Sequence, residues 1–425
     1  MKKFTKLLCV SALSLLTVGN TLGSVVNVSA QDEVTLTWAL WDKDATTYYQ
    51  PLIDAYEAEN PGIKIEMLDL GSTDYMTVLG TQLSGGDDTI DVALIKDTPG
   101  YVSLVNKSQL EPLSELASDV DVDQYGGVID QITMNEDFYA LPVRNDFYVL
   151  YYNKDIFDAA GVDYPQNGIT WDEYTALVQE VSEKGSEALD KHIYGGHYHT
   201  WRSQVQLYGV LDGENTLVSD DYSFLQPYYE DVLAEQEAEQ VQDYSVLKTA
   251  SLHYSAAFYQ NNVATLLMGT WFMPTLKTAI ENGESEEFKW GIATMPIPEG
   301  VEEGTTAGTI TSVGINANSK QKEEAYKFLQ FLSSPEGSEI IAKTGTMPAI
   351  QNEAVVDTIA EATDLDETSK DALSIKQMYL ELPITEIAAE VETILNDGHD
   401  NIMTGNAEIA DELANISEQV KALLQ

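Results

Sequence analysis

Residues 258–274, FYQNNVATLLMGTWFMP, constrain the fold more than any other stretch of the chain. Residues 263–268 form an almost continuous apolar run, which is too short to span a membrane and has the length of a strand buried on both faces of a parallel sheet. In a parallel sheet of this kind, helices cover both faces. Gly269 ends the run, and Pro274 then lies in the first turn of a predicted helix that continues to Asn282 and Gly283.

Trp271 therefore lies on a strand-to-helix corner. In open α/β sheets, ligands bind at the carboxyl ends of strands, where such corners are found. An indole at that place offers a flat apolar face and one N–H donor. Residue type alone leaves a second interpretation open, in which Trp271 only caps the hydrophobic core.

The amino terminus has the pattern of a secretory signal peptide. Lysines at positions 2, 3 and 6 precede an apolar segment over residues 7–18, and small residues then lead to Ala30. We expect cleavage after Ala30 and a secreted or cell-surface protein. Cys9, the only cysteine, lies in this segment and has no convincing lipid attachment context. We therefore expect a mature chain without disulfides or thiol ligands.

The formal net charge of −48 limits the classes of partner. A surface this acidic repels phosphate backbones and anionic lipid headgroups, so we expect no nucleic-acid partner. Hydrophobic residues make up 44% of the chain and aromatic residues 9%, which is enough for a large core and excludes a disordered acidic tail. The length predicts two domains.

Hydrophobic periodicity predicts strands at residues 34–40, 63–67 and 92–95, with helices between them. This alternation is typical of a parallel, doubly wound sheet. Asp42 and Lys43 follow the first strand and Asp97 follows the third, so all three lie at the same sheet edge. They either face a ligand or belong to solvated loops.

Further along, residues 147–152 predict an aromatic strand, and Thr170 with Glu173 predicts a capping box at the start of a helix. The acidic stretch 230–242 predicts a solvated helix face. A strand is expected at 310–315 and a helix at 321–332, and the carboxyl-terminal part is expected to be mostly amphipathic helix.

The sequence gives no strong metal or catalytic signal. His192, His197 and His199 lack a cysteine or carboxylate at metal-site spacing, so ordinary polar packing is favoured. The run Asp119, Asp121, Asp123 departs from an EF-hand loop and predicts a solvated loop. We expect no metal, no cofactor and no catalytic residue, although two well-placed carboxylates of a glycosidase would leave no motif.

A series of motifs resembles the extracellular solute-binding proteins of ABC importers, in the sugar-binding group that includes maltose-binding protein. Each motif is weak alone, and the resemblance lies in their order along the chain: EAENPGIKIEM, DVALIKD, ALPVRNDFYVLYYNKDIFDAAGV, TWDEY, NNVATLLMGTWFMP, SVGINANSK, EEAYKFLQFLSSPEG and TGTMPAI.

The resemblance implies two α/β lobes joined by hinge strands, with the ligand in the cleft between them. Lobe one would hold residues 31–143 and 306–334, and lobe two would hold 144–305 and 335–425. It also implies site residues. Asp42 and Lys43 look like the sugar-facing pair after the first strand, Asp97 like the carboxylate after the third, and Trp271 like the stacking tryptophan. The remaining candidates are an acid near the hinge, a looser aromatic match and a hinge arginine, for which pairing with a carboxylate is the alternative role: Asp146, Trp201 and Arg144.

The implied function is a monomeric, non-enzymatic receptor that captures a mono- or oligosaccharide and delivers it to the permease subunits of an ABC transporter. Carboxylates, lysine and an indole suit the hydroxyls and C–H faces of a sugar. A carbohydrate-active enzyme and a receptor for a peptide or polyamine are the alternatives. The chain departs from the family in lacking a lipid-anchoring cysteine and any tryptophan after Trp290, where only Tyr326 and Tyr379 remain as tyrosines.

Overall fold

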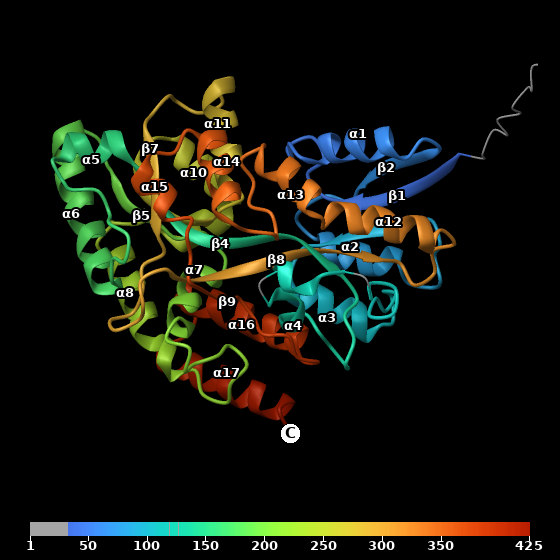
Figure 1. Cartoon of the computed structure of the whole chain (residues 1–425). Coiled ribbons are helices and arrows are strands. Elements are labelled where there is room, and N and C mark those ends of the chain that lie inside the picture. The colour runs from blue at the N-terminus through green and yellow to red at the C-terminus, as the bar shows by residue number, and fades with distance from the viewer. Residues whose placement is uncertain (1–32, 119, 126) are drawn as a thin grey trace, which may run out of the picture.

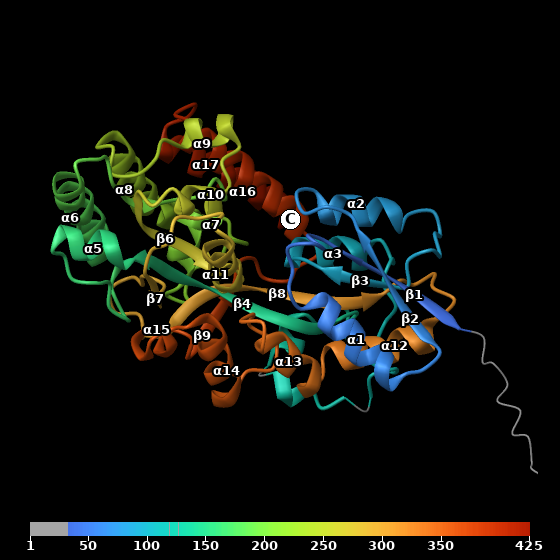
Figure 2. The same ribbon diagram turned by 90° about the horizontal axis from the view of Figure 1, so that it is seen from above.

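The structure is a computed structural model that describes residues 33–118, 120–125 and 127–425. The predicted signal peptide, Cys9 and Asp119 lie outside these residues. Two α/β lobes lie side by side, and the strands β4 and β8 run from one lobe into the other (Figure 1, Figure 2). The predicted two-lobed architecture with hinge strands is therefore confirmed.

The strands of the described chain form one nine-stranded sheet in the order β2-β1-β3-β8-β4-β6-β5, with β7 paired to β4 and β9 to β8. Their bounds are β1 Val34–Leu40, β2 Ile63–Asp69, β3 Val92–Ile95, β4 Leu141–Asn153, β5 Tyr194–His197, β6 Val263–Gly269, β7 Trp290–Thr294, β8 Thr305–Ile315 and β9 Gln377–Leu380.

Helices cover the sheet in both lobes (Figure 2). The α-helices are α1 Tyr49–Glu59, α2 Tyr75–Gln82, α3 Thr98–Asn106, α4 Val128–Gln131, α5 Lys154–Ala160, α6 Trp171–Leu189, α7 Ser203–Gln206, α8 Gln226–Glu237, α9 Tyr244–Ala250, α10 Tyr254–Tyr259, α11 Phe272–Asn282, α12 Lys322–Leu332, α13 Pro335–Ala342, α14 Glu353–Thr363, α15 Glu367–Asp371, α16 Ala388–Met403 and α17 Ile409–Leu423. Short 3₁₀ turns are η1 Val122–Tyr125, η2 Leu207–Val210 and η3 Ser223–Leu225.

The strands β4 and β8 are antiparallel to each other and connect the two lobes. The carboxyl-terminal half of β8 pairs with β3, while its amino-terminal half pairs with β9. The first half of β4 pairs with β8, and residues 148–153 pair with β6 and β7. Both strands thus form hydrogen bonds with other strands in each lobe, so the two lobes share one continuous sheet.

The predicted strand direction is only partly right. β1 is parallel to β2 and β3, as the alternation of strands and helices predicts. β6 is buried along its whole length, as expected, but it is parallel to β5 and antiparallel to β4. Burial on both faces depends on the helices that cover a strand, so it does not fix the direction of the neighbouring strand.

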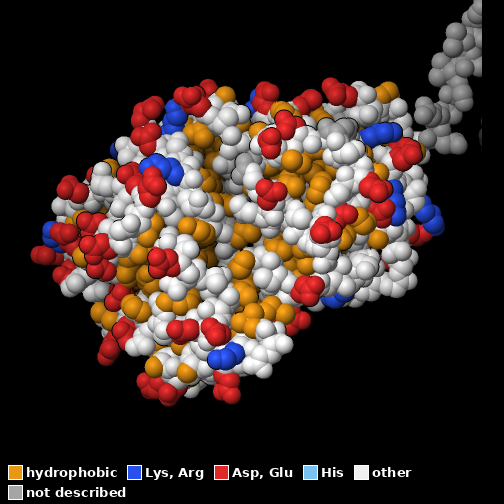
Figure 3. Space-filling view, turned by 60° about the horizontal axis from the view of Figure 1, so that its bottom comes forward, with side chains coloured by type: hydrophobic (Ala, Val, Ile, Leu, Met, Phe, Trp, Pro, Cys, Tyr) orange, Lys and Arg blue, Asp and Glu red, His pale blue; other side chains and the backbone are white. Residues whose placement is uncertain are grey.

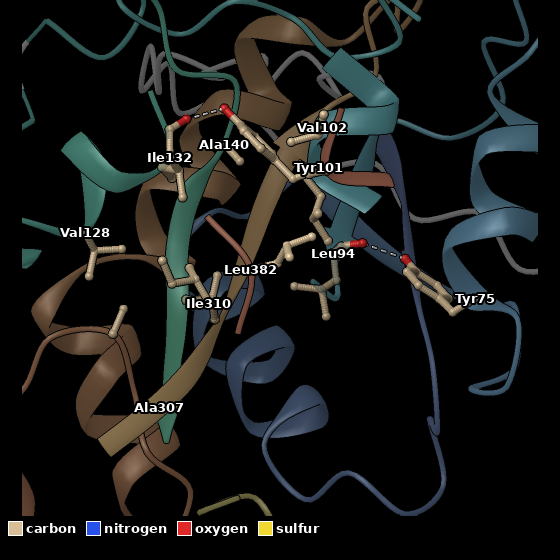
Figure 4. Packing of buried hydrophobic residues seen from close by; sticks show 14 of the residues in the cluster. Tyr75, Leu94, Tyr101, Val102, Val128, Ile132, Ala140, Ala307, Ile310 and Leu382 are labelled. Carbon is tan, nitrogen blue, oxygen red and sulfur yellow. Dashed lines mark hydrogen bonds between the residues drawn. The ribbon is translucent and has the colours of Figure 1, made fainter. Parts of the chain in front are cut away.

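The core of the amino-terminal lobe is closed by buried tyrosines whose hydroxyls bind backbone carbonyls (Figure 4). Tyr75 Oη donates to the carbonyl of Leu94 at 2.8 Å, and Tyr101 Oη donates to that of Ile132 at 2.7 Å. Each ring stays in the core while its polar tip is satisfied. The Tyr75 bond ties α2 to β3, and the Tyr101 bond ties α3 to the end of α4. Asp97 lies between β3 and α3, so both bonds support the elements that position it.

The acidic stretch 230–242 is not a uniformly solvated helix face. Glu235 on α8 is 5% exposed, because it follows Val232 by one helical turn on the inner face of the helix. Burial raises the pKa of Glu235 to about 8, which Asp231 reinforces and the nearby Tyr198 hydroxyl opposes. A count of acidic residues along the sequence does not reveal this inward-facing carboxyl.

Carboxylates outnumber basic side chains on the molecular face that Figure 3 shows. Among the described residues no helix combines the length and apolar character needed to cross a bilayer.

Candidate functional site

Trp271 lies where β6 turns into α11, as predicted. β6 is fully buried, and α11 ends at Gly283, whose φ of 73° suits a left-handed helix cap. The indole is half-buried and packs edge-on against Tyr148, with ring centroids 5.6 Å apart. Its Nε1 donates to Tyr254 Oη at 3.2 Å. The ring therefore borders the core and is also partly open to solvent.

Trp201 joins this corner from the loop after β5. It is 39% exposed, and its ring centroid lies 6.5 Å from that of Trp271. Tyr254 packs against Trp201 at 5.6 Å. Two indoles thus lie together with solvent access, an arrangement that offers apolar faces to a ligand.

Arg144 and Asp146 lie two residues apart on β4 and form an ion pair, with Nη2 and Oδ2 separated by 3.2 Å. Thr270 Oγ1 donates to Asp146 Oδ1 at 2.9 Å, which ties the carboxylate to the residue before Trp271. The Arg144 guanidinium also lies over the ring of Tyr48 at 5.5 Å. Burial raises the pKa of Asp146, and the charge of Arg144 opposes this shift.

The pair is incompletely satisfied within the described protein. Arg144 Nε and Asp146 Oδ2 are buried and make no hydrogen bond there. Buried polar atoms are normally hydrogen-bonded, so these two atoms retain hydrogen-bonding capacity that the described protein does not use.

Asp97 is the N-cap of α3, and its Oδ1 accepts a hydrogen bond from the Gly100 N–H at 2.7 Å. Burial raises the pKa of Asp97, the charge of Glu392 adds to this shift, and Lys96 and Arg202 oppose it. The carboxylate after β3 therefore faces charged side chains that come from the carboxyl-terminal helices and the segment before α7.

Asp42 and Lys43 lie in the exposed loop after β1. Asp42 has a φ of 50°, and its charge acts on Lys96 and His253, so the three side chains lie near one another. For Lys43 the structure shows its backbone N–H bound to Asp69 Oδ2 at 3.0 Å. Among the described residues the Lys43 ammonium forms no ion pair.

The sequence did not single out several side chains that the fold brings to the same site. Lys96 precedes Asp97, donates to the carbonyl of Ser72 at 2.8 Å and lies 5.4 Å from the Trp41 ring centroid. The position of Lys96 directly after β3 could have identified it as a site residue from the sequence alone. Tyr148, two residues after Asp146 on β4, could also have been found from strand alternation. The others come from distant segments that the sequence does not connect: Tyr254, Glu381 and Glu392.

His197 and His199 are buried, with ring centroids 6.1 Å apart. Burial lowers their pKa values to about 4 and about 3, so both imidazoles are neutral at pH 7. His197 Nδ1 is hydrogen-bonded to Gln242 Oε1 at 2.6 Å. In the part of the chain that the structure describes, no three His, Cys, Asp or Glu side chains are grouped as metal ligands.

The site thus combines indole faces, carboxylates and guanidinium groups at the strand ends of two lobes joined by β4 and β8. These features define a two-lobed binding protein with a ligand cleft between the lobes. The family model described as bacterial extracellular solute-binding protein matches residues 42–339, and the chain belongs to this family.

Three similar proteins illustrate the relationship. The crystal structure of a sugar transporter from Rhizobium etli in an open conformation superposes with a TM-score of 0.79 at 44% identity, covering 92% of this chain and 99% of that one. A binding protein of Brucella abortus is 26% identical, over 78% of this chain and 80% of its own length. The multiple sugar-binding protein of Streptococcus mutans is 23% identical, over 73% of this chain and 74% of its own.

Proposed function

We propose that this protein is the exported substrate-binding component of an ABC transporter, which captures a mono- or oligosaccharide and delivers it to a membrane permease. The observation that carries the proposal is the half-buried Trp271, whose neighbour Thr270 donates to Asp146 of the Arg144–Asp146 pair. A sugar ring presents an apolar C–H face to an indole and hydroxyls to carboxylate and guanidinium groups. The names of the Rhizobium etli and Streptococcus mutans proteins point to the same class of ligand.

Asp42, Lys43, Asp97, Asp146, Arg144, Trp201 and Trp271 are proposed as ligand-binding residues. Lobe one is proposed to comprise residues 31–143 and 306–334, and lobe two residues 144–305 and 335–425. Support for these limits comes from β4 and β8, the strands that cross between the lobes.

The protein is further proposed to act without catalysis, as a monomer and without a nucleic-acid partner. Its family binds solutes outside the cytoplasm, which fits export by the predicted signal peptide. The strong acidic charge disfavours binding to phosphate backbones.

Calorimetric titration with a saccharide panel tests the proposal. The panel contains glucose, galactose, maltose, maltotriose, sucrose, raffinose, mannobiose and the chitosan disaccharide, with spermidine and a tripeptide as controls. We expect saturable binding of at least one saccharide and unchanged saccharide after prolonged incubation. Hydrolysis of the bound saccharide would support the enzyme alternative, and binding of the tripeptide or spermidine alone would reject the sugar receptor.

A further inference from the structure

The helix α10, which carries Tyr254, begins with a histidine cap. His253 is the N-cap residue, with a φ of −71° and a ψ of 144° in the extended region. Its Nδ1 accepts a hydrogen bond from the Ser255 N–H at 3.4 Å and lies 2.7 Å from Ser255 Oγ. Because a backbone N–H can only donate, Nδ1 presents its lone pair to Ser255, so the capping imidazole is neutral and carries its proton on Nε2.

Protonation of His253 removes this cap. An imidazolium carries a hydrogen on both ring nitrogens, so Nδ1 would point a second donor at the Ser255 N–H and accept nothing from it. The Ser255 hydroxyl can rotate to accept from the imidazolium, but the backbone N–H loses its partner. A side-chain cap of this kind shifts the equilibrium of a helix start on the order of fivefold, so protonation loosens the first turn of α10.

Tyr254 connects the cap to both indoles of the candidate site. Its ring centroid lies 4.0 Å from that of His253 and 5.6 Å from that of Trp201. Its Oη accepts the hydrogen bond from Trp271 Nε1 at 3.2 Å. The ring is buried and packs edge-on against Phe272 at 5.2 Å, so its position follows that of the first turn of α10. A change at the cap therefore reaches both indoles through one side chain.

The surroundings of His253 allow it to titrate in mildly acidic solution. The side chain is exposed, so protons reach it from the solvent. Partial burial lowers the pKa of His253 below its ordinary value of 6.5, the charge of Asp42 opposes this shift, and Lys96 adds to it. The neighbouring His199, at 5.9 Å between ring centroids, stays neutral because burial lowers its pKa to about 3. The Tyr254 hydroxyl keeps its proton, because burial raises its pKa.

We propose that His253 and Tyr254 are positioning residues for the indole pair, and that protonation of His253 weakens saccharide binding because α10 loses its cap. The inference rests on the proposed function and adds its regulation by pH. Neutral His253 holds Tyr254, and through it Trp201 and Trp271, in the arrangement that captures the saccharide, whereas acidic surroundings favour release. Because coupling between two sites is reciprocal, saccharide binding in turn favours loss of the proton from His253.

His253→Asn tests the proposal, because asparagine is a strong N-cap that does not titrate. His253→Ala removes the cap at every pH. His192→Asn is the matched control, since His192 is exposed, packs edge-on against Tyr194 at 4.5 Å and precedes the opposite end of β5 from Trp201.

The wild type and the three variants are titrated by calorimetry at pH 7.5 and pH 5.0 with the panel saccharide that the wild type binds most tightly. The tryptophan emission maximum and the melting temperature of each free protein are measured at the same pH values. Affinities are compared as the ratio of variant to wild type at one pH, so that other titrating groups cancel. Glu381 is one of these, because burial raises its pKa to about 7.

We expect His253→Asn to bind like the wild type at pH 7.5 and about fivefold more tightly than the wild type at pH 5.0. His253→Ala should bind about fivefold more weakly than the wild type at pH 7.5 and equally at pH 5.0, where both lack the cap. His192→Asn should match the wild type at both pH values. In the free proteins, the emission maximum should shift between the two pH values more in the wild type than in His253→Asn.

The same ratio of His253→Asn to wild-type affinity at both pH values overturns the proposal and leaves the sugar-receptor function intact. Equal losses for His253→Asn and His253→Ala at pH 7.5 also overturn it, because the imidazole itself and not the cap is then required. A lower melting temperature of His253→Ala with unchanged affinity assigns the cap a structural role alone. If the wild type binds no saccharide, the proposed function fails, and an emission shift that His253→Asn shares with the wild type rejects the coupling of His253 to the indoles independently.

Discussion

At the residue scale, side chains with the same chemistry have different roles because burial differs. Glu235 and Glu237 lie on one helix, yet Glu235 is buried and Glu237 is exposed. Trp271 and Trp290 are both half-buried, but Trp271 neighbours Trp201 and the Arg144–Asp146 pair, whereas Trp290 packs against Tyr151. Sequence reasoning placed Trp271 correctly on its corner, because a strand, a glycine and a helix start are local signals. Sequence reasoning did not find Glu381 and Glu392, because only the fold brings residues so far apart in the chain together with Tyr148 and Arg202.

Trp271→Ala tests whether the indole binds the ligand. A central aromatic contact costs about 2 kcal/mol or more when truncated, so we expect roughly a 30-fold loss of saccharide affinity by calorimetry. Trp290→Ala is the control, because it removes a comparable indole at the start of β7. It should lower the melting temperature and leave affinity unchanged. A Trp271→Ala variant that melts early but binds normally would show that the indole only packs the core.

Glu235→Gln tests the buried carboxyl of α8. The folded protein holds this proton up to about pH 8, while the unfolded chain releases it near the ordinary value of 4.5. Folding therefore takes up a proton between these values, and this group makes the wild type less stable as pH rises from 4.5 to 8, by roughly 4 kcal/mol at most. Urea unfolding at several pH values should show that the variant lacks this decline.

The comparison uses the difference between variant and wild type at each pH, so the opposing titration of the buried histidines cancels. Glu237→Gln, on the exposed face of α8, should retain the wild-type pH dependence. Parallel stability curves for Glu235→Gln and wild type between pH 4.5 and 8 would contradict the assignment.

At the element scale, the sequence predicts the positions of helices and strands more accurately than it predicts their ends or the direction of strand pairing. The capping box of Thr170 and Glu173 is present, with the Thr170 N–H donating to Glu173 Oε2 at 2.9 Å. β8, however, begins at Thr305 and not at residue 310, because its first half reads as glycine- and threonine-rich loop. β9 was not predicted. Its four residues are held by pairing with β8, a long-range contact that leaves no local pattern.

Gly308 lies in this half of β8, at a position where the neighbouring atoms leave no room for a side chain. A Cβ atom there would meet the carbonyl oxygen of Asp146 at 2.4 Å and Met378 Sδ at 2.5 Å. Gly308→Ala should therefore separate β8 from β4 and lower the free energy of unfolding by about 1–3 kcal/mol, the usual cost of overpacking. Because Asp146 lies at the clash, saccharide affinity should fall as well.

Gly80→Ala is the matched control for Gly308→Ala. Gly80 is inside α2, and a Cβ there meets nothing closer than 3.8 Å. Alanine in a helix interior is favoured over glycine, so the same substitution should be neutral or stabilise by up to about 1 kcal/mol in urea unfolding. Equal effects of the two substitutions would show that β8 can tolerate a side chain at Gly308.

At the scale of the whole molecule, the candidate residues belong to both lobes, so their contacts with a ligand depend on how the lobes are arranged. Asp42 and Asp97 follow strands at one end of the sheet, while Trp271 follows β6 near the other end. The similar structure from Rhizobium etli is in an open conformation. Motif order along the sequence was enough to predict two lobes and their hinge strands. It gave no information on the side-chain positions across the cleft, because these depend on β4, β8 and the path of the chain after β9.

Saccharide binding is expected to compact the protein in solution. If the carboxylates and indoles of the two lobes bind one ligand, the ligand favours the arrangement in which both sets reach it, and the lobes move as rigid bodies about β4 and β8. Small-angle X-ray scattering with and without the saturating panel saccharide should then give a smaller radius of gyration for the complex. The Trp271→Ala variant, at a saccharide concentration that leaves it unbound, should keep the radius of the free wild type. An unchanged radius for the saturated wild type would show that the site is preformed and that capture needs no closure.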